Sequence, residues 1–136
     1  MRTYWALGLG LTIMIAGAAN AQMPTLTPDQ ENTLTREIGD RIATQSVDCI
    51  RLSPRLQLTV VSDDLLIYRI GGKRYLSRTA GTCHGLARGD KPILSLGKSR
   101  ICAGDWIAVE DLVSGIRTGG CAIGRFAVYA KPGKDD

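Results

Sequence analysis

The feature of this chain that most restricts its fold is a set of four cysteines spread widely along it, Cys49, Cys83, Cys102 and Cys121. An even number of cysteines in a short exported chain is typical of a disulfide framework. Structural zinc sites usually use closely spaced pairs of cysteines, which are absent here, and the chain has no C-x-x-C redox motif. The sequence therefore predicts two disulfides, with neither a metal nor a cofactor.

The order of the cysteines leaves all three disulfide pairings open. We favour Cys83 with Cys102, because this pair closes a short loop, and Cys49 with Cys121, because that pair ties the ends of the domain. In the chain-entropy model each closure would stabilise the fold by about 3–5 kcal/mol. The connectivity matters because it decides which distant segments lie together.

The N-terminus has the pattern of a secretory signal peptide over residues 1–21. Arg2 precedes an apolar run over residues 6–19, and Ala19-Asn20-Ala21 is a small-x-small cleavage site. The run is shorter than the roughly 20 residues of a transmembrane helix. We expect cleavage after Ala21, with no transmembrane anchor left, and export to the periplasm of a Gram-negative cell or secretion. An uncleaved anchor is the alternative.

Residues 22–46 are predicted to form an N-terminal helical segment. Thr27 can cap a helix, Pro28 suits its first turn, and Gln30 completes a capping box. Apolar residues at helical spacing follow. We expect the helix to end near Gln45.

Residues 47–130 have the pattern of a β-rich domain. Ser62-Asp63-Asp64 and Gly71-Gly72 are turn signals that separate the first three strands into a meander. Residues 117–120 are expected to form a loop, and residues 131–136 a disordered tail. We predict a mainly β fold, a small antiparallel barrel or sandwich with one N-terminal helix, held together by disulfides. The strands are expected over residues 56–60, 65–70, 75–76, 93–96, 106–109 and 121–129.

No group of residues predicts catalysis. His84, the only histidine, follows a cysteine that a disulfide would occupy, so we interpret it as a turn residue. Asp63-Asp64 and Glu110-Asp111 are interpreted as turn residues, and no G-x-S-x-G motif occurs. Asp105 is expected to accept hydrogen bonds from backbone N–H groups just before a strand. The sequence assigns no catalytic residue.

Charge is the feature most open to a functional interpretation. The net charge is +4, and residues 69–100 contain eight bases against one acid, Asp90. If the strands place these bases on one face, they form an anion-attracting patch, whereas the alternative is an ordinary solvated face. The expected partners are anionic envelope components, namely lipopolysaccharide, phospholipid or acidic glycan, and not nucleic acid. The eight bases are Arg69, Lys73, Arg74, Arg78, Arg88, Lys91, Lys98 and Arg100.

Three short elements follow one another in the second half of the chain. They are Cys83-His84-Gly85-Leu86, Cys102-Ala103-Gly104-Asp105 and Cys121-Ala122-Ile123-Gly124. The ordered C-x-G-L, C-x-G-D and C-x-x-G elements resemble an uncharacterised family of exported proteobacterial proteins, a domain of unknown function, over residues 47–128. The resemblance implies export and architecture but no activity. His84 stands where the family often has proline, which argues against a general catalytic role for it.

Together these observations predict a non-enzymatic envelope binding or interaction module that uses its basic stretch. Two other classes stay open. One is an enzyme of unrecognised type, which would need Asp105, His84 or Glu110 to converge with other polar groups in a pocket. The other is a purely structural or inhibitor-like scaffold.

Overall fold

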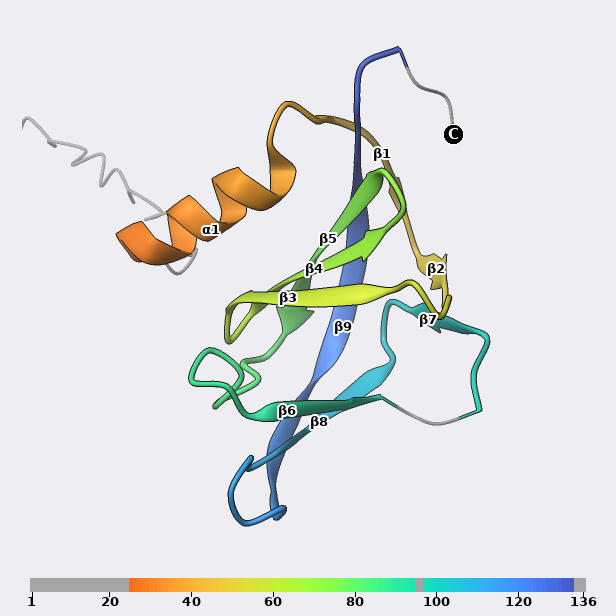
Figure 1. Cartoon of the computed structure of the whole chain (residues 1–136). Helices are drawn as coiled ribbons and strands as arrows, with labels where there is room; N and C mark the ends of the chain where they lie inside the picture. The colour runs from red at the N-terminus through yellow and green to blue at the C-terminus, as the bar shows by residue number, and fades with distance from the viewer. Residues whose placement is uncertain (1–24, 95–96, 134–136) are drawn as a thin grey trace, which may run out of the picture.

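The computed structural model describes residues 25–94 and 97–133, so the predicted signal peptide lies outside the described residues. Within these ranges one helix precedes nine strands (Figure 1). No helix in the described part of the chain is long and apolar enough to cross a membrane. The elements are α1 (Pro28–Ile38), β1 (Ile42–Val47), β2 (Cys49–Arg51), β3 (Gln57–Ser62), β4 (Leu65–Ile70), β5 (Lys73–Ala80), β6 (Lys91–Leu94), β7 (Arg100–Cys102), β8 (Trp106–Glu110) and β9 (Arg117–Ala130).

Seven strands form one antiparallel sheet in the order β3-β4-β5-β9-β8-β6, with β1 also paired to β9. The sheet curls into a half-barrel, which confirms the mainly β prediction with one N-terminal helix. The long strand β9 organises it, since Ala122 pairs with Ala80 of β5 on one edge and with Trp106 of β8 on the other. Two further strands, β2 and β7, form a separate two-stranded ribbon.

The helix begins as expected but ends earlier. Thr27 Oγ1 accepts a hydrogen bond from the Gln30 N–H, and the Gln30 side chain accepts one from the Thr27 N–H, which confirms the capping box. The prediction of a helix to Gln45 is wrong, because α1 ends at Ile38 with Gly39 at a φ of 60°. The following residues form β1 against β9, where β-branched side chains are favourable.

The expected meander of β3, β4 and β5 is confirmed, with turns at residues 63–64 and 71–72. The prediction of a loop over residues 117–120 is wrong, because β9 already begins at Arg117. Gly120 allows a close approach there, since a Cβ on it would meet the ring of Trp106. The strand expected over residues 93–96 is β6, and residues 95–96 lie outside the described part.

Apolar residues fill both faces of the curled sheet. On one face Tyr68 and Phe126 are fully buried in the main core, together with Ile50 and Ile101 of the β2–β7 ribbon. On the other face a smaller cluster around Leu65 packs against α1. The helix and the ribbon therefore belong to different apolar clusters of the same sheet.

Two disulfides hold this arrangement, but the pairing that we favoured is wrong. Cys49 is bonded to Cys102, and Cys83 to Cys121, with Cα–Cα distances of 4.0 and 5.1 Å. The first pair follows from the register of β2 and β7, which sets these two cysteines opposite one another. The second lies in the main core, where Cys83 and Cys121 are both buried. Strand register explains the Cys49–Cys102 bond, and loop length predicted neither bond.

Candidate functional site

The β2–β7 ribbon places two arginines side by side on its outer face. Arg51 is the Cα partner of Arg100, and Ile50 is the partner of Ile101. Because side chains alternate along a strand, the buried isoleucines point into the core and the exposed arginines point away from it. The Cys49–Cys102 disulfide lies two residues away on the same outer face. We call Arg51 and Arg100 the arginine pair.

The hydrogen-bond pattern of the ribbon brings the arginine pair close together. The Ala103 N–H donates to the carbonyl of Asp48 at 2.7 Å, and the Leu52 N–H donates to the carbonyl of Ser99 at 2.9 Å. Bonded and non-bonded residue pairs alternate in an antiparallel ladder, so the arginine pair occupies a non-hydrogen-bonded position. Side chains there begin with Cβ atoms about 4.5–5.5 Å apart, and like charges facing each other destabilise the pairing.

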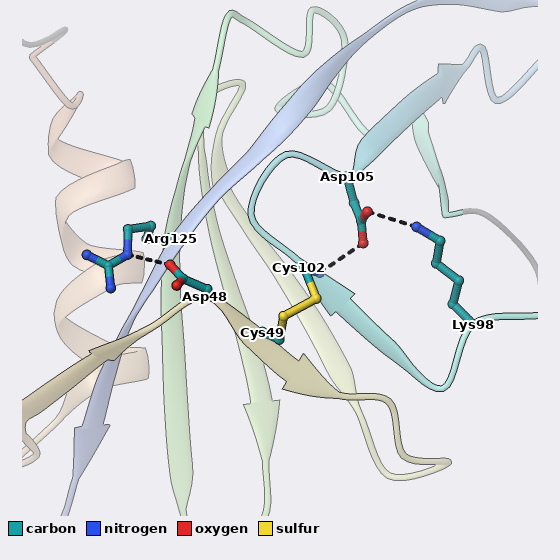
Figure 2. Close-up of a disulfide and its surroundings, with 6 residues drawn as sticks. All are labelled: Asp48, Cys49, Lys98, Cys102, Asp105 and Arg125. Carbon is teal, nitrogen blue, oxygen red and sulfur yellow. Dashed lines mark hydrogen bonds and ion pairs between the residues drawn. A yellow bond between two sulfur atoms is a disulfide. The ribbon is translucent and has the colours of Figure 1, made fainter.

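No carboxylate in residues 25–94 and 97–133 makes an ion pair with the arginine pair. Neither guanidinium makes an ion pair or a hydrogen bond with any residue in the described ranges. Two cations near the ribbon are neutralised, since Lys98 binds Asp105 at 2.8 Å and Arg125 binds Asp48 at 2.6 Å (Figure 2). The ribbon therefore carries uncompensated positive charge at the arginine pair.

Asp105 has a structural role in the turn that follows the ribbon. Its Oδ2 accepts a hydrogen bond from the Cys102 N–H at 2.9 Å, which confirms the expectation that it accepts from the backbone (Figure 2). The hydrogen bond from Lys98 and then the one from Cys102 hold the pKa of this carboxyl below its ordinary value. Asp105 is thus an ionised group that closes the turn between β7 and β8.

An open hollow of about 580 Å³ lies beside the arginine pair. This volume is within the range of small-ligand sites, roughly 300–1,000 Å³. Both guanidinium-bearing residues line it, so an anion in the hollow can be reached from both strands. The other lining residues are Cys49, Ile50, Leu52 and Ser99.

The eight bases of the predicted patch are spread over several strands and loops, although Arg69 is the Cα partner of Arg74. Four are in ion pairs: Arg74 with Glu37, Arg78 with Asp64, Arg88 with Asp90, and Lys98 with Asp105. The other four, Arg69, Lys73, Lys91 and Arg100, make no ion pair with a described residue. Of these, Arg69 and Lys73 flank the β4–β5 turn, Lys91 begins β6, and Arg100 begins β7. Only Arg100 has a second uncompensated base as its direct partner across a strand pair.

That second base, Arg51, was missed in the sequence because it lies outside the basic stretch. The signal that could have found it is a reversed pair of tripeptides, Cys49-Ile50-Arg51 and Arg100-Ile101-Cys102. In an antiparallel ribbon these segments match residue by residue. The cysteines form the disulfide, the isoleucines are buried, and the arginines form the arginine pair.

The groups considered for catalysis stay apart. His84 is exposed in the turn after β5, and Glu110 ends β8. The hollow that Asp105 lines, of about 350 Å³, contains neither of them. Asp63 is engaged in turn structure, where its Oδ1 accepts a hydrogen bond from the Ala87 N–H at 2.7 Å. The described ranges hold no cluster of three or more metal-binding side chains.

No family model, no curated protein and no solved structure matches this chain. The resemblance to an exported family of unknown function therefore stays a prediction. Its glycines have a structural explanation: Gly85 and Gly104 take positive φ values of 99° and 91°, which only glycine adopts readily. A Cβ on Gly124 would collide with the backbone carbonyl of Arg78.

Proposed function

We propose that the protein is an exported, non-enzymatic module of a Gram-negative envelope that holds an anionic group between Arg51 and Arg100. The single observation that carries the proposal is the arginine pair, in which Arg51 and Arg100 face each other across two strands with no ion-pair partner among the described residues. Two disulfides and the apolar N-terminal run support an oxidising compartment outside the cytoplasm.

The arginine pair suits a phosphate or a carboxylate. A guanidinium presents a planar fork of N–H donors that matches the oxygens of either group, often through two bonds. Two forks on neighbouring strands can bind different oxygens of one oxyanion. The bound anion would also remove the repulsion within the pair, so binding would stabilise the ribbon. The candidate sources are lipopolysaccharide phosphates, phospholipid headgroups and acidic glycans.

Binding measured separately to lipopolysaccharide, phospholipid and acidic glycan shows which of them supplies the anion. The protein is sedimented with lipopolysaccharide or with phosphatidylglycerol vesicles, and is titrated calorimetrically with a uronic-acid glycan. Each measurement is made at about 0.1 M and at about 1 M salt, where the screening length falls from roughly 10 to 3 Å. We expect binding to at least one of them, weaker at high salt. No binding to any of them, or binding indifferent to salt, contradicts the proposal.

A double variant tests whether the anion binds at the arginine pair. Arg51→Gln/Arg100→Gln removes two charge-assisted contacts and is expected to weaken binding by about tenfold or more. Arg36→Gln/Lys131→Gln removes the same charge from exposed positions on α1 and after β9, and serves as the matched control. Equal weakening in both variants would show that net charge, and not the arginine pair, is recognised.

A further inference from the structure

The Cys49–Cys102 disulfide shares its surroundings with the arginine pair. Cys49 is exposed, and it lines the hollow of about 580 Å³ together with Arg51 and Arg100. Each cysteine lies two positions from the arginine of its own strand, and side chains two apart lie on the same face of a strand. Figure 2 shows the bond joining β2 to β7. A small molecule in the hollow can therefore contact Cys49 and both arginines.

The two carboxylates next to this disulfide are both engaged by other cations. Asp48 is bound by Arg125 and Asp105 by Lys98, as Figure 2 shows. Neither carboxylate forms an ion pair with the arginine pair, and nor does any other carboxylate in residues 25–94 and 97–133. The disulfide thus lies beside two cations that no described carboxylate neutralises through an ion pair.

Positive charge beside a disulfide favours thiol–disulfide exchange in two ways. The nucleophile is a thiolate, so the cations attract it, and they attract it more strongly when the thiol also carries carboxylates. The exchange expels a second thiolate, and neighbouring cations stabilise this leaving group as it forms. The other disulfide, Cys83–Cys121, is buried in the main core, where a thiolate from solvent does not reach it.

We propose that Cys49–Cys102 is a reactive disulfide that exchanges with anionic low-molecular-weight thiols, and that the arginine pair promotes this exchange. The first thiolate attacks Sγ of Cys49, the more exposed of the two cysteines, and forms a mixed disulfide there. The electron pair of the broken S–S bond leaves on Sγ of Cys102, which takes a proton from water.

A second thiolate completes the reaction. It attacks the thiol-derived sulfur of the mixed disulfide and releases Cys49, which is protonated in turn, together with the oxidised dimer of the thiol. The protein disulfide gains two electrons, which the two thiols lose, and the protons that the thiols give up end on the two cysteines. The exchange requires no bound phosphate or glycan, because the group that the arginine pair attracts is the thiol itself.

Exchange rates with three thiols test the inference. The folded protein is treated with glutathione, 2-mercaptoethanol or cysteamine, and opening of Cys49–Cys102 is followed by alkylation and peptide mass spectrometry. Each rate is divided by the thiolate concentration, and the negative charge of the thiolate rises from cysteamine through 2-mercaptoethanol to glutathione. Arg51→Gln/Arg100→Gln is expected to react with glutathione about fivefold or more slowly than the parent. We expect 2-mercaptoethanol to be slowed less and cysteamine least.

Matched variants separate the exchange from the proposed anion site. Arg36→Gln/Lys131→Gln removes the same charge from exposed positions on α1 and after β9, and is expected to react like the parent. Arg51→Lys/Arg100→Lys keeps the charge but loses the planar fork of donors. It should therefore retain the parent's rate with glutathione while weakening the anion binding of the proposed function.

A measurement on the parent protein keeps the test decisive if a variant does not fold. Raising the salt from about 0.1 M to about 1 M screens the arginine pair, so it should slow glutathione more than cysteamine. The same salt dependence for all three thiols overturns the inference. So does an unchanged rate with glutathione in Arg51→Gln/Arg100→Gln, or an equal change with all three thiols, which would reflect altered access and not charge.

Discussion

At the residue scale, Tyr68 is the most unusual member of the core. Its side chain is fully buried and meets Phe126 edge-to-face, with ring centroids 5.5 Å apart. Its hydroxyl has no hydrogen-bond partner among the described residues, and burial raises its pKa. A buried hydroxyl without a partner loses its hydrogen bonds to water on folding. The ring therefore stabilises the folded state, whereas the unpaired hydroxyl destabilises it.

Tyr68→Phe is therefore expected to raise the free energy of unfolding, by about 1 kcal/mol or more, because it removes the unpaired hydroxyl and keeps the ring. Chemical denaturation measures this change, with the half-buried Tyr75→Phe as the comparison. A decrease in stability would contradict the prediction and would show that the hydroxyl is hydrogen-bonded in solution.

At the element scale, the turn between β7 and β8 depends on one ionised carboxylate. The pKa of Asp105 is lowered in the folded protein, first by the hydrogen bond from Lys98 and then by the one from Cys102. A group with a lowered pKa contributes its full stabilisation above its unfolded pKa, about 3.9 for aspartate, and loses it as the pH falls through the folded value. The turn is thus stabilised at neutral pH and weakened in acid.

We expect the Cys102 amide to exchange with solvent more readily as the pH falls below about 4, after correction for intrinsic exchange. Hydrogen exchange followed by NMR measures it. In Asp105→Asn the amide should already be less protected at neutral pH and should lack this acid response. An acid response of equal size in that variant would show that another group controls the turn.

The comparison of sequence and structure is also clearest for individual elements. The capping box at Thr27 and Gln30 and the turn at residues 71–72 involve neighbours in the chain, so local patterns predicted them. The end of α1 was mispredicted because apolar spacing alone continues past Gly39, where the backbone turns. The β2–β7 ribbon was missed because each strand has only three residues and gains its stability from a partner far along the chain. The arginine pair was missed with it.

At the scale of the whole molecule, the two disulfides lie in different surroundings. Cys83 and Cys121 are buried in the main core, whereas Cys49 is exposed on the ribbon. Reduction needs a thiolate to reach a sulfur atom, so access decides which bond opens first. One disulfide is therefore protected by the fold, and the other is open to the solvent.

Mild reductant is expected to open Cys49–Cys102 before Cys83–Cys121. Alkylation followed by peptide mass spectrometry identifies the labelled cysteines, and the intact mass shows whether residues 1–21 have been removed. Cys49→Ser/Cys102→Ser, which removes a bond worth roughly 2–5 kcal/mol, should abolish the early labelling without affecting the later event. Labelling of Cys83 and Cys121 first, in folded protein, would contradict this prediction.

The position of β9 has a consequence for how such a chain is made. This strand follows all the other described strands in sequence, yet it joins β5 on one edge to β8 and β1 on the other. Contacts between distant segments form slowly and only once both partners are present. A chain that leaves the ribosome, or threads a membrane pore N-terminus first, cannot complete its sheet until its final strand emerges. The sheet therefore closes late, after its last strand has been made.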